Sequence, residues 1–181
     1  TLEAWAQPHE YEDRCHFIIG SDIAGEFGIG FGVCGVMLSA EYIAGMDKSN
    51  QVVPLAQWSH LAAVFAKNET RLYYNGELVK TGPPTKTLGG THFVIGNVGE
   101  HNPSSYFIGD IQSVRISKGT RYTDNFAPNK YLETDESTVL LYDSTSVKGD
   151  QVIDLSGHNN DGTIERLTVQ SYLPADNPEK K

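Results

Sequence analysis

The sequence predicts an all-β protein, folded as a two-sheet antiparallel β-sandwich of the jelly-roll type. The 181 residues include 18 glycines, 8 prolines, 9 tyrosines and 7 phenylalanines, a composition that suits short strands joined by turns. Roughly ten to twelve short segments alternate apolar and polar residues or form brief apolar runs between turn signals. No stretch sustains a helical apolar period. These observations together favour two sheets packed face to face.

The length favours a single domain, because β-sandwiches of this size usually share one core. We expect that domain to span residues 1–173 and to be followed by a flexible tail at 174–181. The chain opens within a strand pattern, at TLEAWA, so we expect a module of a larger secreted or surface protein.

Strands in the first part of the chain are indicated by alternation. Leu2, Ala4 and Ala6 share one strand face, as the period of two requires. A polar loop, SDIAGE, separates the next two apolar runs, and a turn is expected at Cys34-Gly35. The predicted strands here are residues 1–6, 15–20, 27–33 and 36–43.

The segment 57–66, QWSHLAAVFA, is mostly apolar and is typical of a strand buried on both sides. Trp58 and His60 share one face of it, and we expect Trp58 in the core and His60 hydrogen-bonded at the sheet margin. In the following segment, 70–81, Asn75-Gly76 is the strongest hairpin signal in the chain, because a type I′ turn needs positive φ at both central residues.

The second half contains further alternating segments with two loop-like stretches between them. One is GEHNPSSY, and the other follows the segment that ends in VRIS. The predicted strands here are residues 91–98, 107–117, 138–144 and 162–173.

Charge and hydropathy exclude two classes of partner. The formal net charge is −9, and no basic stripe is available to neutralise nucleic-acid phosphates. Apolar runs are too short for a membrane span and are interrupted by glycine. We therefore expect no nucleic-acid partner and no membrane insertion.

The two cysteines, Cys15 and Cys34, allow two interpretations. If residues 15–20 and 28–33 pair around SDIAGE, the two residues lie almost opposite each other, within the short Cα–Cα range of a disulfide. A disulfide would fit an oxidising compartment. The alternative is two small buried hydrophobic residues, and the sequence leaves both open.

Several motifs in fixed order resemble the laminin-G-like, or concanavalin A-like, jelly-roll modules of secreted bacterial and phage proteins. They are TLEAWA, QWSHLAAVF, TRLYYNGELV, FVIGN and FIGDIQSVRISKGTRYTDNFAP. The resemblance implies a two-sheet sandwich that serves as a carbohydrate-binding or adhesive accessory domain, frequently with a structural calcium. Residues 138–164 also look like a family segment. The chain departs from the family at Gln112-Ser113, where members usually carry an acidic pair, and Asp110 lies two residues earlier.

The acidic residues do not predict a glycosidase. Jelly-roll glucanases place acids at i, i+2 and i+4 on one strand face, so that the two catalytic carboxylates lie close together. Glu10 and Glu12 share parity here but lie in a polar, loop-like segment. A serine-hydrolase elbow and an HExxH motif are also missing from the sequence. We therefore expect a protein without catalytic activity.

Two polar loops combine aromatic rings with amides, carboxylates and hydroxyls, SAEYIAGMDKSN and NVGEHNPSSYF. Sugar sites need this mixture, because a ring stacks on the pyranose while polar groups bind its hydroxyls. The candidate ligand-binding residues are Tyr42, Asp47, His101, Asn102 and Tyr106.

The densest cluster of potential ligands is DLSGHNNDGTI, residues 154–164. It lacks the EF-hand pattern, and its Asn, Asp and Gly residues are typical of tight turns. A turn between strands is the main interpretation. The alternative is a structural Ca²⁺ site using Asp154, Asn160 and Asp161, since hard oxygens suit a hard cation.

The sequence thus predicts a non-catalytic, lectin-like module that binds a glycan or polysaccharide and is secreted or held at the cell surface. An adhesive or structural protein-interaction domain of a surface or phage tail protein is the first alternative. A glycoside hydrolase of the same fold is the second, because one fold hosts many functions.

Overall fold

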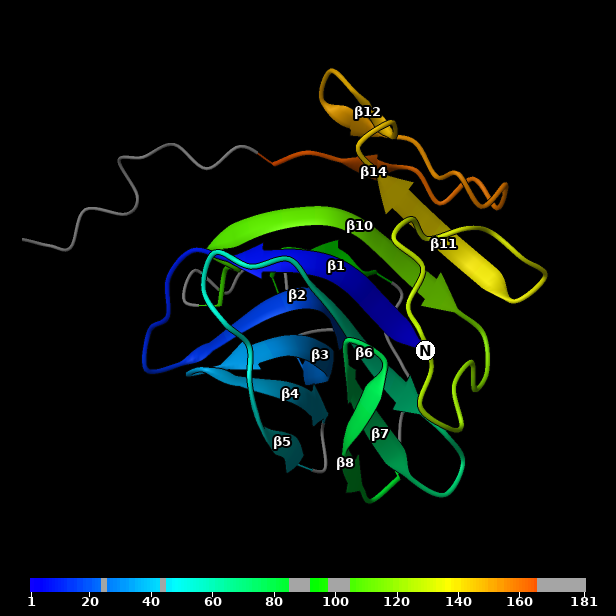
Figure 1. The fold of residues 1–181 in the computed structure, drawn as a ribbon. Helices are drawn as coiled ribbons and strands as arrows, with labels where there is room; N and C mark the ends of the chain where they lie inside the picture. The colour runs from blue at the N-terminus through cyan, green and yellow to red at the C-terminus, as the bar shows by residue number, and fades with distance from the viewer. Residues whose placement is uncertain (24–25, 43–44, 85–91, 98–104, 166–181) are drawn as a thin grey trace, which may run out of the picture.

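The computed structural model describes residues 1–23, 26–42, 45–84, 92–97 and 105–165 (Figure 1). The described residues form strands and turns, and they contain no helix that could span a membrane.

All paired strands run antiparallel, in two large sheets and one small one. The six-stranded sheet has the order β11 (Thr138–Asp143), β10 (Gly109–Ser117), β1 (Leu2–Pro8), β6 (Ser59–Phe65), β7 (Thr70–Tyr74) and β8 (Glu77–Gly82). The five-stranded sheet has the order β5 (Gly45–Val52), β4 (Met37–Tyr42), β3 (Glu26–Cys34), β2 (Cys15–Ile23) and β9 (Val94–Ile95). The small sheet contains β12 (Val147–Lys148), β13 (Gln151–Val152) and β14 (Gly162–Thr163).

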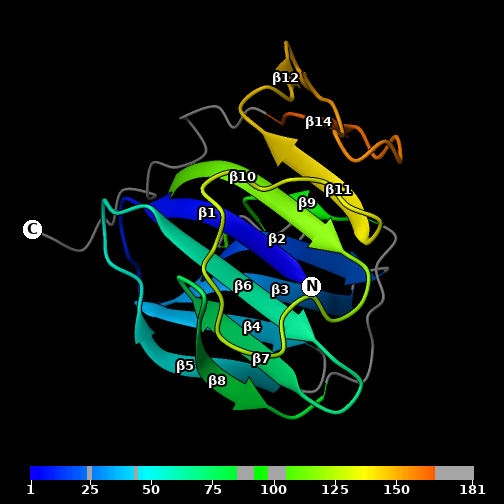
Figure 2. The ribbon, with the colours of Figure 1, turned by 45° about the vertical axis from the view of Figure 1, so that its right-hand side comes forward.

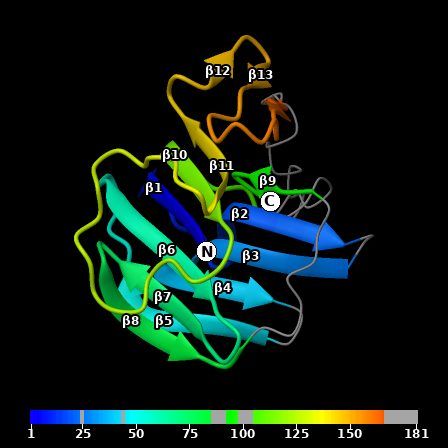
Figure 3. The ribbon, with the colours of Figure 1, turned by 90° about the vertical axis from the view of Figure 1, so that its right-hand side faces the viewer.

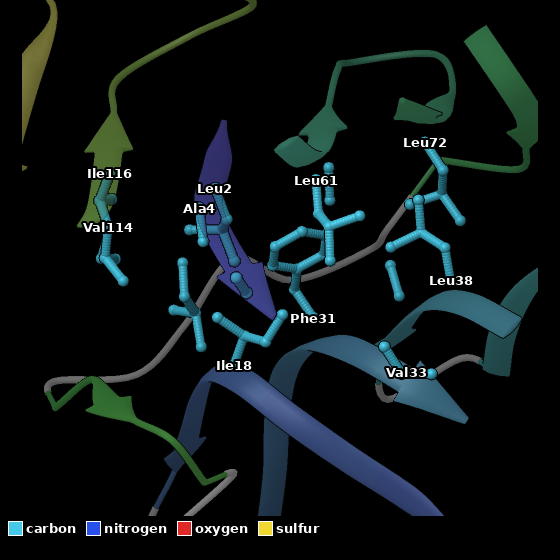
Figure 4. Close-up of a cluster of buried hydrophobic side chains, with 14 of the residues drawn as sticks. Leu2, Ala4, Ile18, Phe31, Val33, Leu38, Leu61, Leu72, Val114 and Ile116 are labelled. Carbon is cyan, nitrogen blue, oxygen red and sulfur yellow. The ribbon is translucent and has the colours of Figure 1, made fainter. Parts of the chain in front are cut away.

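The two large sheets pack face to face and enclose the hydrophobic core, which confirms the predicted sandwich (Figure 4). Leu2, Ala4 and Ala6 point inward from β1, as their alternation predicts. Opposite them, Ile18 and Phe31 are fully buried on the five-stranded sheet. Burial of this apolar surface is the main force that holds the sheets together.

The hairpin between β7 and β8 has the predicted turn. The φ angles of Asn75 and Gly76 are 48° and 81°, as a type I′ turn requires. Gly76 is needed for a second reason, which is the close approach of the Phe126 backbone. The Phe126 amide donates a hydrogen bond to the Gly76 carbonyl at 2.9 Å. A Cβ at this position would lie 1.8 Å from the Phe126 carbonyl oxygen.

Strand β6 is buried on both faces, as its apolar sequence predicts. Its inward residues join the core, and its outward residues Ala62 and Val64 lie beneath residues 118–137, which we call the crossing segment. Figure 2 shows this segment passing over the outer face of the six-stranded sheet. Tyr122 and Phe126 of the segment stack with ring centroids 3.6 Å apart and pack against the buried pair. The segment predicted as a loop therefore forms a second, smaller hydrophobic layer.

Cys15 and Cys34 form a disulfide at the end of the β2–β3 hairpin. The two residues are direct partners in the strand register, and their Cα atoms are 3.8 Å apart. The disulfide interpretation of the two cysteines is therefore confirmed.

Replacing both cysteines with serine is expected to lower the free energy of unfolding by about 3 kcal/mol. The bridge closes a loop with a sequence separation of 19 residues, so losing it returns conformational entropy to the unfolded chain. Urea denaturation of the double variant measures the loss. Alkylation without reductant should leave the mass of the wild type unchanged, and two labelled thiols would contradict the bridge.

Three expectations for individual segments were wrong. Trp58 is 43% exposed, because it follows a turn at Ala56, whose φ is 53°, and stands before β6, which starts only at Ser59. His60 is hydrogen-bonded as expected, but in the middle of the six-stranded sheet rather than at its margin. The stretch after β4 forms a further strand, β5, where a polar loop was predicted.

Candidate functional site

At one side of the sandwich, β10 and β11 lie near β9 and the small sheet (Figure 3). Residues of these elements line a groove of about 1030 Å³. This volume is slightly above the range of about 300–1,000 Å³ that is usual for ligand sites. The five-stranded sheet ends at β9, whereas the six-stranded sheet continues to β11. The groove therefore follows from the unequal widths of the two sheets at this edge.

Aromatic side chains contribute to the groove wall from one strand and from two segments that lead into strands. Phe93 precedes β9 and is 43% exposed, so its ring is available for contact. His92 lies beside it in sequence, Tyr142 comes from β11, and Tyr106 comes from the segment that leads to β10. Rings of this kind can stack on the apolar face of a sugar.

Polar side chains lie among these rings. Asn97 is buried after β9, and Gln112 and Asp143 belong to β10 and β11. Asn160 and Asp161 line the groove from the loop before β14. Amides both donate and accept hydrogen bonds and carboxylates accept them, so this set can bind hydroxyl groups.

Tyr142 is held in place through its hydroxyl end. Its hydroxyl donates to the Asn160 carbonyl at 2.5 Å. A Cβ at position 162 would lie 2.9 Å from that hydroxyl, so Gly162 lets β14 approach the ring closely. Burial raises the pKa of Tyr142, and the negative charges of Asp154 and Asp161 raise it further. The hydroxyl therefore stays protonated at neutral pH.

The loop at residues 154–161 pairs with the outer edge of β11. The carboxylate of Asp154 accepts hydrogen bonds from the amides of Leu141 (3.1 Å), Ser156 (2.9 Å) and Asn160 (3.1 Å). It also accepts one from the Ser156 hydroxyl at 2.7 Å. The Leu155 amide donates to the Leu141 carbonyl at 3.0 Å, as a neighbouring strand would.

These bonds satisfy backbone groups that would otherwise be open at a sheet edge. The Val139 carbonyl accepts from the Ser156 hydroxyl and from the Asn160 side-chain amide, both at 2.9 Å. Exposed strand edges invite pairing with other chains, and a covering loop prevents this. The cluster in residues 154–164 is thus a turn, as its composition predicts, and it also caps an edge.

The calcium hypothesis for Asp154, Asn160 and Asp161 stays a prediction. In the part of the chain that the structure describes, no group of three or more His, Cys, Asp or Glu side chains could hold a metal ion. The Asp161 carboxylate accepts a hydrogen bond from the Asp154 amide at 2.8 Å, and both oxygens of Asp154 already accept hydrogen bonds. The loop is therefore ordered by its own hydrogen bonds.

Of the five predicted ligand-binding residues, the structure describes the side chain of Tyr106 alone. Tyr106 lines the groove, and its carbonyl accepts a hydrogen bond from the His16 ring at 2.5 Å. His101 and Asn102 lie outside the described residues. The backbones of Tyr42 and Asp47 belong to β4 and β5, three and four strands away from β9, and their side chains are likewise not described.

A second cluster of charged groups lies under the crossing segment. Glu3 and His60 are both fully buried, and their side chains approach to 3.1 Å. Glu3 also accepts hydrogen bonds from Arg115 Nε (2.8 Å) and the Tyr122 hydroxyl (2.8 Å). Burial alone would raise the pKa of Glu3, but hydrogen bonds from His60 and Arg115 outweigh it and lower the pKa to about 2. We assign this cluster a structural role, because its central carboxylate has no exposed surface.

Sequence reasoning missed several groove residues, Phe93 and Tyr142 among them. Both belong to segments whose alternation predicts strands, and neither stands in a motif that signals a ligand. Gln112 and Ser113 stand where the family usually carries an acidic pair, and Asp110, two residues earlier, does not join Ser113 in a shared site. The Asp110 carboxylate pairs with the exposed His9 ring at 2.9 Å, and Ser113 is buried.

Comparisons with known proteins agree with this architecture. A solved structure of a Bacteroides ovatus protein, proposed to bind carbohydrate, superposes with a TM-score of 0.69 at 17% sequence identity and covers 90% of this chain. The chain spans 50% of the length of that protein. No curated protein sequence matches this chain. A family model described as the concanavalin A-like lectin/glucanases superfamily matches residues 1–125, which confirms the resemblance seen in the sequence. The chain therefore belongs to the concanavalin A-like lectin/glucanase superfamily.

Proposed function

We propose that this protein is a non-catalytic carbohydrate-binding module and that the groove between β9, β10, β11 and the small sheet is its glycan site. The observation that carries the proposal is the composition of the groove wall. Exposed Phe93 offers a stacking surface, and the amides of Gln112 and Asn160 and the carboxylate of Asp161 line the same groove. Sugar sites combine these two features, because a pyranose has an apolar face and a rim of hydroxyls.

The wider setting is consistent with the same proposal. The structural neighbour is itself proposed to bind carbohydrate, and it is about twice as long as this chain, which supports a place in a larger multidomain protein. A disulfide between Cys15 and Cys34 is the kind of bond that persists outside the cytosol. We place the module outside the cell or at its surface on this basis.

Phe93→Ala is expected to weaken glycan binding at least about tenfold. Stacking contributes about 0.5–1.5 kcal/mol beyond the buried area of the ring, and removing the ring loses both. A glycan array identifies the ligand, and isothermal titration then compares the variant with the wild type. Tyr131→Ala is the matched control, because Tyr131 is 63% exposed and lies in the crossing segment, away from the groove.

The same panel tests the alternatives. If neither array nor titration shows binding to any polysaccharide, the adhesive role becomes the better explanation of the fold. Release of reducing sugar from a bound polysaccharide would instead make the protein a glycosidase. In that case Asp161→Asn, in the groove, should abolish the release, whereas Glu10→Gln, on an exposed loop, should not.

A further inference from the structure

The charged side chains of the groove wall are mainly acidic. Asp143, Asp161 and Glu165 bring three carboxylates to its wall. Among the lining residues that the structure describes there is no lysine or arginine, and His92 is the one group there that could carry a positive charge. The formal charge of the whole chain, −9, has the same sign.

Two of these carboxylates are fixed by the backbone. Asp161 Oδ1 accepts from the Asp154 amide at 2.8 Å. Asp143 Oδ1 accepts from the amide and the hydroxyl of Thr145, both at 2.7 Å. A carboxylate held in this way cannot swing far from an incoming ligand, so its charge remains at the groove.

The charge of one of them, Asp161, acts on a neighbouring group that lines the groove. After burial, the charges of Asp154 and Asp161 are the causes that raise the pKa of Tyr142, whose ring lines the same groove. A negatively charged group of a ligand placed beside Tyr142 would be repelled by the same two carboxylates. In a groove with low-dielectric walls, such repulsion is stronger than in open solvent.

We propose that the groove selects uncharged glycans and rejects those that carry uronic acid or sulfate groups. This inference rests on the proposed function. A neutral sugar hydroxyl can donate a hydrogen bond to Asp143, Asp161 or Glu165, whereas an ionised carboxylate or sulfate has only acceptor oxygens. The same three residues therefore bind the neutral ligand and repel the anionic one.

The test compares pairs of soluble polymers that differ mainly in charge. Suitable pairs are hydroxyethylcellulose and carboxymethylcellulose, galactan and polygalacturonate, and desulfated and native carrageenan. Binding is measured by isothermal titration at low ionic strength, where charge effects are largest. We expect the neutral member of a pair to bind at least about tenfold more tightly than the anionic member.

A triple variant tests whether the groove carboxylates are responsible. Asp143→Asn, Asp161→Asn and Glu165→Gln remove three charges and keep an acceptor oxygen at each position. The variant should bind the anionic polymer at least about threefold more tightly than the wild type does, because the repulsion is gone.

The control variant removes the same number of charges elsewhere. Asp13→Asn, Glu77→Gln and Glu136→Gln alter exposed side chains that do not line the groove. It should keep the preference for neutral polymers. This result would show that the selectivity comes from the groove carboxylates and not from the net charge of the protein. Equal affinity of the wild type for both members of a pair would overturn the selectivity while leaving glycan binding intact. Failure to bind any of the polymers would overturn both proposals.

Discussion

Glu3→Gln is expected to lower the free energy of unfolding by about 3–5 kcal/mol, the largest effect of any single substitution considered for this protein. The Glu3 carboxylate is fully buried and is bound to His60, Arg115 and the Tyr122 hydroxyl. Neutralising it leaves the buried Arg115 without a counter-charge. Urea denaturation followed by tryptophan fluorescence measures the difference.

Two further variants serve as controls for this prediction. Glu10→Gln makes the same chemical change on an exposed residue and should shift stability by no more than about 0.5 kcal/mol. Tyr122→Phe removes one hydrogen bond to the carboxylate and should cost about 1.5–3 kcal/mol, which is measurable even if Glu3→Gln does not fold. A Glu3→Gln protein as stable as Glu10→Gln would contradict the structural role of the cluster.

The same carboxylate should make stability depend on pH in a defined window. The pKa of Glu3 is lowered from its ordinary value of 4.5 to about 2 in the folded protein. Because the pKa is lowered, the unfolded state binds the proton at a higher pH than the folded state does. The stability that ionised Glu3 contributes is therefore complete above pH 4.5 and is lost as pH falls towards 2. The wild type should therefore lose stability in this window more steeply than Glu3→Gln, as urea midpoints at successive pH values would reveal.

Asp154→Ala is expected to cost about 2–4 kcal/mol and to make the protein self-associate. Asp154 is buried, and its loss leaves the amides of Leu141, Ser156 and Asn160 without their acceptor. The loop at residues 154–161 then no longer covers the β11 edge, and open edges pair with one another. Urea denaturation measures the stability, and light scattering at increasing concentration measures the association.

His158→Ala is the matched control, because its side chain is exposed on the same loop and should leave both measurements unchanged. The pair of variants also tests the calcium hypothesis. A bound ion must raise the thermal midpoint of the wild type and of His158→Ala, but not of Asp154→Ala. If millimolar calcium produces no rise, the metal site is removed from consideration. A monomeric and fully stable Asp154→Ala protein would contradict the capping role.

Local features could be predicted from the sequence where a few neighbouring residues decide the structure. The β7–β8 turn depends on Asn75-Gly76, and these two residues tolerate positive φ in any context. Cys15 and Cys34 are paired by the register of one short hairpin, so counting residues was sufficient to place them opposite each other. The ordered family motifs placed these pieces in a known sandwich.

Features that depend on long-range contacts could not be predicted. Tyr106 was expected at a sugar site and lines the groove, but the groove residues come from segments up to 73 positions apart, from His92 to Glu165. The spacing of residues in the sequence does not indicate which strands lie next to one another at the edge of a sandwich. Glu3, His60 and Arg115 show the same limit, because each looks like an ordinary strand residue until β1, β6 and β10 align side by side.

The sequence by itself determined the all-β class, the principal strands, the hairpin turn and the family, because alternation and turn chemistry act over a few residues. The tertiary structure decided where charge is buried and where a ligand can bind. Those properties depend on how far each sheet extends and on what covers it. Residues 154–161 illustrate both: their composition predicts a turn, and only the position of β11 beside them makes that turn a cap on the sheet edge.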